Sequence, residues 1–129
     1  MKKIAILIIS FVISINFAKA QNDISSLNPN LQNLYHKMDQ GLLKINSEYT
    51  FKLKLKFASE KAILFQDGYV KVDKETRYSF LKFKRNYVLP EGLTRGQNVY
   101  VQFKVIEVRS GATTPGMPYL FVELKGIIP

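Results

Sequence analysis

Between Tyr49 and Ala58 the sequence alternates strictly between apolar and polar side chains, and this pattern constrains the fold more than any other feature. Every second residue from Tyr49 to Phe57 is aromatic or leucine, and the residues between them are Thr50 and three lysines. A period of two is typical of a β-strand with one buried and one solvated face. A helix would scatter these apolar side chains, because its period is 3.6 residues. We therefore predict a long strand with lysines facing solvent.

Five further apolar stretches favour strands, and residues typical of turns separate them. The predicted strands cover 61–65, 69–72, 77–85, 98–109 and 119–125. Asp67-Gly68 is a favoured two-residue hairpin turn and predicts pairing of the strands on either side of it. In the stretch 98–109 every second residue from Val99 to Val105 is apolar, but the next apolar residues, Ile106 and Val108, fall on the other face of the strand. This change predicts a β-bulge or a sharp bend.

One amphipathic helix is expected before the strands. Asn28 is suited to cap the helix, and Pro29 is favoured at its first position. An apolar stripe with helical spacing follows, and a glycine at position 41 ends or bends the helix. The stripe consists of Leu31, Leu34, Tyr35, Met38, Leu42 and Ile45. A lone helix cannot bury such a stripe, so it must pack against the strands.

The first 20 residues have the layout of a secretory signal peptide. Lys2 and Lys3 form a positive start, an apolar run covers 4–17, and Ala18-Lys19-Ala20 provides a cleavage site. The apolar run is shorter than the roughly 20 residues that span a bilayer, and no later segment is apolar enough to do so. We expect cleavage, followed by a single domain over 21–129.

The chain contains no cysteine and one histidine, His36. These counts exclude disulfide scaffolds, cysteine-based zinc sites, iron–sulfur clusters, thiol nucleophiles and sites that need two histidines. Without a cysteine the exported protein cannot be lipid-anchored through one, so we expect it to be soluble in a periplasm or outside the cell. Ser79 and Lys82 match the S-x-x-K pattern of acyl-serine enzymes, but a strand would place them on opposite faces. We expect no enzymatic activity, no cofactor and no metal ion.

These elements predict a mostly β, or α+β, domain. Its expected architecture is an N-terminal amphipathic helix packed on a small antiparallel β-barrel of five to six strands, since closure removes exposed sheet edges. A two-sheet β-sandwich is the alternative.

The stretch Gly96-Gln97-Asn98-Val99-Tyr100-Val101 resembles the entry into a late strand of many OB-fold domains. The closing strand at 119–124 and the long strand at 49–58 extend the resemblance to about residues 49–126. The chain is similar to small secreted OB-like domains of bacterial envelopes that carry an N-terminal helix. This resemblance implies a ligand groove across the middle strands and the adjacent loops, and it does not imply an enzyme.

Basic side chains provide the first candidate binding residues. With 19 Lys and Arg against 10 Asp and Glu, the chain has a formal net charge of +9. Positive side chains on one face suit the binding of phosphate or sulfate groups. The alternative is a solvated face on which lysines prevent edge-to-edge pairing of strands. The basic candidates are Lys52, Lys54, Lys56, Lys82, Lys84 and Lys104.

Three aromatic residues complete the candidate ligand-binding set. They are Tyr100, Tyr119 and Phe121, and each occupies an alternate position of its strand that otherwise carries polar residues. Pairing of the last two strands would therefore gather them beside lysines. OB-type proteins stack bases or sugars on such surfaces. The alternative is that the amphipathic helix covers this face.

Two functional hypotheses follow. The first is an exported, non-catalytic binding module whose ligand is anionic or carbohydrate-like, such as a polyanion or a glycan. The alternative is an envelope structural or protein–protein interaction domain, whose partner is another envelope protein.

Overall fold

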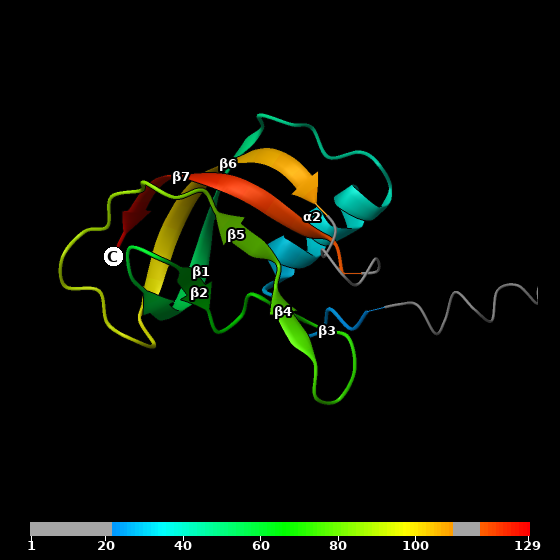
Figure 1. Cartoon of the computed structure of the whole chain (residues 1–129), viewed down its shortest axis with the longest axis horizontal. Coiled ribbons are helices and arrows are strands. Elements are labelled where there is room, and N and C mark those ends of the chain that lie inside the picture. Colours follow the sequence, from blue (N-terminus) through cyan, green and yellow to red (C-terminus); the bar gives the residue numbers. More distant parts are fainter. Residues whose placement is uncertain (1–21, 110–116) are drawn as a thin grey trace, which may run out of the picture.

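The computed structural model describes residues 22–109 and 117–129. The predicted signal peptide at 1–20 and residues 110–116 of the loop before the last strand lie outside this part. Within it, the protein is mostly β, with one helix and seven strands (Figure 1). The elements are α2 (Pro29–Asp39), β1 (Glu48–Ala58), β2 (Ile63–Phe65), β3 (Tyr69–Lys71), β4 (Arg77–Ser79), β5 (Leu81–Phe83), β6 (Asn98–Arg109) and β7 (Tyr119–Ile128).

The predicted start of the helix is confirmed. Asn28 is the N-cap of α2, and its side-chain oxygen accepts a hydrogen bond of 2.9 Å from the backbone N–H of Asn30. The helix ends at Asp39, and Gly41 follows with a φ of 72°. The predicted apolar stripe is therefore too long, because Leu42 and Ile45 lie beyond the helix and are exposed.

Replacing Asn28 by alanine is expected to lower the free energy of unfolding by about 1–2 kcal/mol, since an N-cap is lost. The Asn28 amide also donates hydrogen bonds to the Lys52 carbonyl at 3.1 Å and to Asp67 Oδ2 at 3.2 Å, so the loss should reach the upper part of this range. Urea denaturation would measure the change. Asn33→Ala, at an exposed position of the same helix, is the matched control and should not destabilise the protein.

Five strands form a sheet in the order β2-β1-β6-β7-β5. The pairs β1–β2, β1–β6 and β6–β7 are antiparallel, whereas β5 and β7 are parallel. The expectation of an entirely antiparallel sheet is therefore wrong. A parallel pair needs a long connection between its strands, and here the connection includes the whole of β6.

The ladder between β6 and β7 has two irregularities. Register shifts occur between Gln102 and Phe103 and between Val105 and Glu107. The second shift confirms the bulge that the change in apolar parity near Ile106 predicts, because an inserted residue moves the following side chains to the other face.

Asp67-Gly68 does not form the predicted hairpin. β2 pairs with β1, and β3 pairs with β4, so the turn is a corner between two ladders. Asp67 Oδ1 accepts a hydrogen bond from the Lys54 N–H at 3.1 Å, and the Gly68 carbonyl accepts one from the Phe80 N–H at 2.9 Å. These long-range bonds hold the corner in place of a hairpin ladder.

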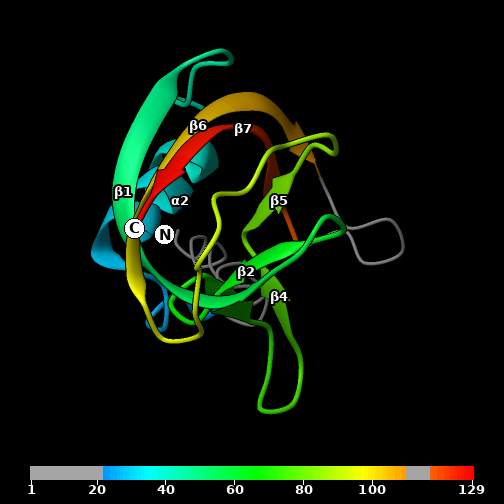
Figure 2. The ribbon, with the colours of Figure 1, turned by 90° about the vertical axis from the view of Figure 1, so that its left-hand side faces the viewer.

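β3 and β4 form a separate two-stranded sheet, which projects from the body of the molecule (Figures 1 and 2). In the described part of the chain it does not face the larger sheet as the second layer of a sandwich. The larger sheet is strongly curled (Figure 2), and side chains of its two edge strands meet, with the rings of Phe65 and Phe83 6.1 Å apart. No ladder joins these edges among the described residues; β3, which follows β2, and β4, which precedes β5, pair with each other in the smaller sheet.

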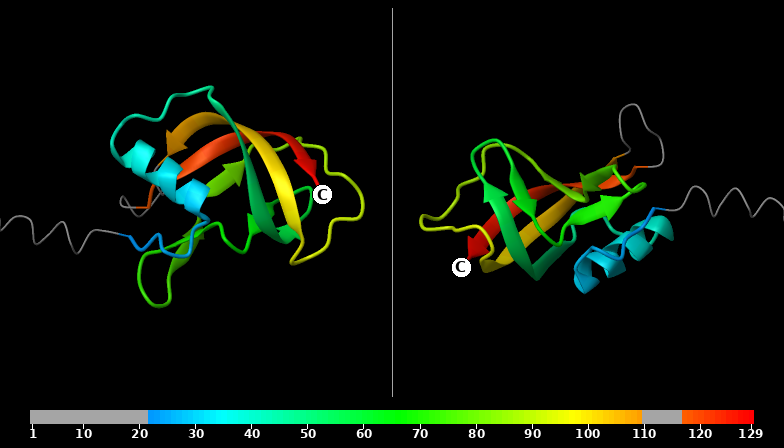
Figure 3. Two further views of the ribbon diagram at one scale, coloured as in Figure 1. Left: turned by 180° about the vertical axis from the view of Figure 1, so that it is seen from behind. Right: turned by 90° about the horizontal axis from the view of Figure 1, so that it is seen from below.

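One apolar core joins the helix to the strands. Leu31 and Leu34 of α2 belong to the same buried cluster as side chains from the strands, and the Tyr35 ring lies 5.4 Å from that of Phe80. The helix lies at the end of the molecule away from the C-terminus (Figure 3). The opposite end and the outer faces of the strands therefore remain available for other contacts.

Candidate functional site

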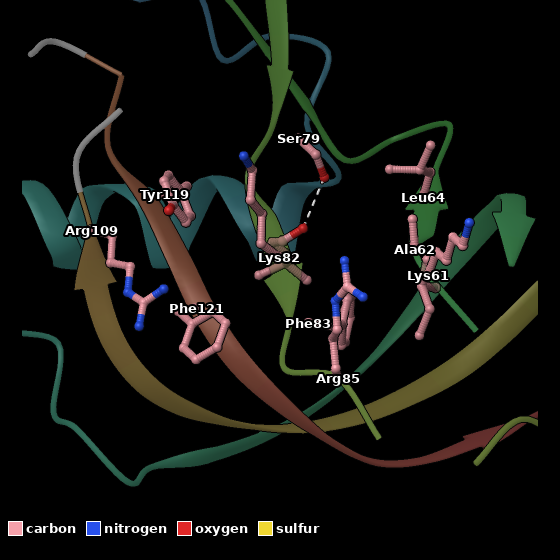
Figure 4. Close-up of a pocket in the computed structure, with 12 residues that line it drawn as sticks. Lys61, Ala62, Leu64, Ser79, Lys82, Phe83, Arg85, Arg109, Tyr119 and Phe121 are labelled. Atoms are coloured by element: carbon pink, nitrogen blue, oxygen red, sulfur yellow. Dashed lines mark hydrogen bonds between the residues drawn. The ribbon is translucent and has the colours of Figure 1, made fainter. Parts of the chain in front are cut away.

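A groove of about 470 Å³ lies on the outer side of the sheet, across β5 and β7 (Figure 4). Arg109, Tyr119 and Phe121 lie on one side, Lys61 and Leu64 lie on the other, and Lys82 lies between them. We call it the basic groove. Its lining residues are Lys61, Ala62, Ile63, Leu64, Ser79, Leu81, Lys82, Phe83, Arg85, Arg109, Tyr119 and Phe121.

The alternation of β7 explains why its first aromatic residues face the groove. Leu120 and Val122 are fully buried, so Tyr119 and Phe121 point to the opposite face of the sheet. The start of β7 is anchored by the Tyr78 hydroxyl, which donates a hydrogen bond of 2.9 Å to the Pro118 carbonyl. Burial, followed by the nearby phenol of Tyr35, raises the pKa of Tyr78, so this donor keeps its proton at neutral pH.

An irregularity at Phe80 places Ser79 and Lys82 on the same side of the sheet. Phe80, which lies between β4 and β5, and Leu81, the first residue of β5, are consecutive buried residues, so the strand alternation shifts by one residue. The prediction that Ser79 and Lys82 lie on opposite faces is therefore wrong, since both line the groove. The Ser79 hydroxyl donates a hydrogen bond of 2.9 Å to the Leu81 carbonyl (Figure 4).

The groove is positively charged. Four of its lining side chains are cationic, and none of the described ones is acidic; the cations are Lys61, Lys82, Arg85 and Arg109. Two of them rest on aromatic rings of the groove. Lys82 Nζ lies 4.6 Å from the ring centroid of Tyr119, and Arg109 Cζ lies 3.9 Å from that of Phe121. Such cation–π contacts restrict the motion of the charged groups.

One carboxylate, Glu107, lies beside the groove, because it is opposite Phe121 in the ladder between β6 and β7. Glu107 Oε1 is 3.1 Å from Arg109 Nη2, and both side chains are partly exposed. This hydrogen bond raises the pKa of Arg109 above its ordinary value, so the guanidinium stays charged. Glu107 also offsets part of the positive charge that Arg109 presents to the groove.

Three of the predicted ligand-binding residues lie together in the basic groove: Lys82, Tyr119 and Phe121. Parallel pairing of β5 with β7 brings them together, because Lys82 lies opposite Phe121 in the ladder. The alternative that the helix covers Tyr119 and Phe121 is wrong for these two residues, which line a groove. The helix instead directs Tyr35 toward Phe80.

The lysines of β1 lie elsewhere. Lys52 and Lys54 are exposed on the outer face of β1, opposite Tyr100 and Asn98 of β6. None of them lines the basic groove in the described chain. Lys56, at the bulged end of β1, contacts Tyr69 instead, with its Nζ 4.8 Å from the ring centroid.

Tyr100, Lys84 and Lys104 also lie outside the basic groove. Tyr100 pairs with Ile128, whereas Tyr119 pairs with Arg109 at the other end of the same antiparallel ladder. The prediction that Tyr100 joins Tyr119 on one surface is therefore wrong, since about 30 Å of strand separates the two positions. Lys104 forms an ion pair of 3.5 Å with Glu123, and Lys84 borders a small hollow that Glu123 also lines.

Two cations of the groove, Lys61 and Arg109, are not among the site residues predicted from the sequence. Lys61 lies in the turn between β1 and β2, and Arg109 is the last residue of β6. Neither belongs to a run of basic residues. The signal that identifies Arg109 is its register opposite Tyr119, which depends on the pairing of strands far apart in the chain.

Residues 22–109 and 117–129 contain no group of three or more His, Cys, Asp or Glu side chains arranged to hold a metal ion. No helix among them is long and apolar enough to cross a membrane. Comparison of the chain with protein-family models, curated proteins and solved structures finds no match.

Proposed function

We propose that the protein is a non-catalytic binding module and that the basic groove binds the anionic groups of its ligand. The observation that carries this proposal is the lining of the groove, which includes four cations and two aromatic residues of the outer face of β7 and no described carboxylate. Phosphate, sulfate or carboxylate oxygens are the natural partners of such a set, because charge-assisted hydrogen bonds are the stronger ones.

The cation–π contacts support the proposal because they prearrange the site. A free lysine or arginine side chain loses considerable rotamer entropy when it is fixed by a ligand. Lys82 on Tyr119 and Arg109 on Phe121 are already restricted before the ligand arrives. Binding then costs less conformational entropy than binding to freely moving surface lysines.

We also propose that the fold is an OB-like barrel of the partly open kind. β2 with β3 then acts as one bent strand, and β4 with β5 as another, so that five strands surround the core. The β3–β4 pairing, the parallel β5–β7 pairing and the Phe65–Phe83 contact support this scheme. The helix would then close the barrel end away from the C-terminus. In OB folds the face of the second and third strands binds oligonucleotides and oligosaccharides. Under this scheme the basic groove, which is lined by residues of β2 and β5, would belong to the corresponding face.

Export is the third part of the proposal, and it rests on the sequence of residues 1–20. Expression of the full chain in a secretion-competent bacterial host should give a processed protein that begins at Gln21. Intact-mass spectrometry of the purified protein would measure the processing. Recovery of the protein with Met1 and the apolar run still attached would contradict cleavage at Ala20.

Binding of a labelled heparin oligosaccharide to the purified protein tests the proposed function. We expect binding that weakens at least about tenfold between about 50 and 200 mM salt, and no binding of a neutral dextran oligosaccharide. Absence of heparin binding at low salt would contradict the proposal. Recovery of one specific envelope protein by crosslinking in that case would favour the interaction-domain alternative.

Replacing Glu107 by glutamine is expected to strengthen heparin binding by about twofold to fivefold at low salt, because Arg109 is no longer offset by a neighbouring negative charge. Fluorescence anisotropy with the labelled oligosaccharide would measure the change. Glu91→Gln, at an exposed loop position outside the groove lining, removes the same charge and is the control. Equal effects of both variants would show that only net charge matters.

A further inference from the structure

A second group of cations and an aromatic ring lies beyond the basic groove. Tyr69 of β3 contacts Lys56 of β1 and Arg77 of β4. Lys56 Nζ is 4.8 Å and Arg77 Cζ is 4.5 Å from the Tyr69 ring centroid, and the Lys56 ammonium also donates a hydrogen bond of 3.3 Å to the Tyr69 hydroxyl. We call these three residues the Tyr69 cluster.

The strand register places the Tyr69 cluster beside the basic groove. Tyr69 is directly opposite Ser79, which lines the groove, and opposite residues of an antiparallel pair share one face. Arg77 is two residues before Ser79 on β4, so it lies on the same face about 7 Å farther along.

Both regions use aromatic rings in the same way. Lys82 lies over Tyr119, Arg109 over Phe121, and both Lys56 and Arg77 over Tyr69. A cation over a ring occupies the surface on which a base or a sugar would stack. A guanidinium on a ring still presents its N–H groups at its edge, where they can bind oxyanions. The rings therefore suit holding cations better than stacking ligand rings.

From these contacts we infer that the basic groove and the Tyr69 cluster form one track for a linear anionic polysaccharide, which binds through its sulfate or carboxylate groups. The inference rests on the proposed function and adds the class and the length of the ligand. A ligand that reaches both regions must be longer than the groove alone. Charged groups at intervals along one chain meet this requirement, whereas a small anion does not.

Two heparin fragments, a disaccharide and an octasaccharide, test the length of the track. We expect Arg77→Gln to weaken octasaccharide binding about tenfold, since one charge-assisted contact is lost, and to leave disaccharide binding in the groove unchanged. Lys44→Gln is the control, because it removes the same charge from an exposed position that precedes the start of β1, whereas Lys56 lies near the end of that strand. It should change neither the octasaccharide affinity nor the disaccharide affinity. Equal octasaccharide affinities of Arg77→Gln and Lys44→Gln would overturn the inference.

Oligothymidylate and an abasic deoxyribose-phosphate chain of the same length test how the rings are used. We expect the two chains to bind equally well and neither to bind more tightly than the heparin octasaccharide. Markedly tighter binding of oligothymidylate than of the abasic chain would show base stacking and would make single-stranded nucleic acid the favoured ligand. If wild-type protein binds none of the four probes, the proposed function itself fails, and the inference fails with it.

Discussion

Replacing both Lys82 and Arg109 by glutamine is expected to weaken the binding of a heparin oligosaccharide about a hundredfold at low salt. Under the proposed function each residue would make one charge-assisted contact with the ligand, and such a contact is worth about tenfold in affinity. The two side chains lie within the groove and rest on Tyr119 and Phe121. Fluorescence anisotropy would give the dissociation constants of the variant and of the wild-type protein.

The matched control for this variant is the replacement of Lys52 and Lys54 by glutamine. These lysines are exposed on the outer face of β1, outside the basic groove, and their removal changes the net charge by the same amount. We expect the control variant to bind within about threefold of the wild-type protein, through the loss of long-range attraction alone. A hundredfold loss of affinity in the control variant would indicate that the binding site is on the outer face of β1.

The Phe80→Ala variant is expected to lose about 3–5 kcal/mol of the free energy of unfolding, as is usual when a buried phenylalanine is truncated. Phe80 is completely buried, and its ring lies 5.4 Å from that of Tyr35 on α2. Its backbone donates to the Gly68 carbonyl at 2.9 Å and accepts from the Leu120 N–H at 2.8 Å. The side chain thus fills the space where the helix, the corner at Gly68 and the start of β7 meet.

Urea denaturation of Phe80→Ala and of Phe57→Ala would test this role. Phe57 is 51% exposed at the end of β1, so its truncation should cost less than about 1 kcal/mol. The slope of free energy against urea should stay the same in both variants if the native fold is kept. Similar losses in the two variants would contradict the central position of Phe80 in the core.

Features that depend on local chemistry could be predicted from the sequence. The N-cap at Asn28 depends on a side chain that bonds to a backbone two residues away. The strand β1 follows from a period of two, and the bulge after Val105 follows from its interruption. In each case the signal and the structure lie within the same few residues.

Features that depend on the pairing of distant segments could not be predicted. Asp67-Gly68 has the composition of a hairpin turn, yet the strands on its two sides pair with other partners. Turn chemistry fixes a change of direction, while the choice of partner depends on packing of the whole chain. The parallel pairing of β5 with β7 is such a choice, and the candidate site depends on it.

The candidate site shows the same division. The alternation of apolar and polar residues along each strand predicts which lysine and aromatic residues lie on the outer face, and it places Lys82 and Phe121 on that face correctly. The alternation of apolar and polar residues could not show that these two residues lie opposite each other in paired strands. It also could not show that Lys52 and Lys54 of β1 lie outside the groove. Arg109 enters the site only through its register with Tyr119.

The salt dependence of oligothymidylate binding, measured for the wild-type protein and the two double variants, tests the basic groove most directly. For a single strand, each neutralised charge contributes about 0.7 to the slope of log affinity against log salt, so the four groove cations contribute about −3 and the Tyr69 cluster adds to this slope when the strand reaches it. We expect Lys52→Gln with Lys54→Gln to keep the wild-type slope and Lys82→Gln with Arg109→Gln to make it shallower by about 1.4. A shallower slope in the β1 variant, with an unchanged slope in the groove variant, would contradict binding in the basic groove.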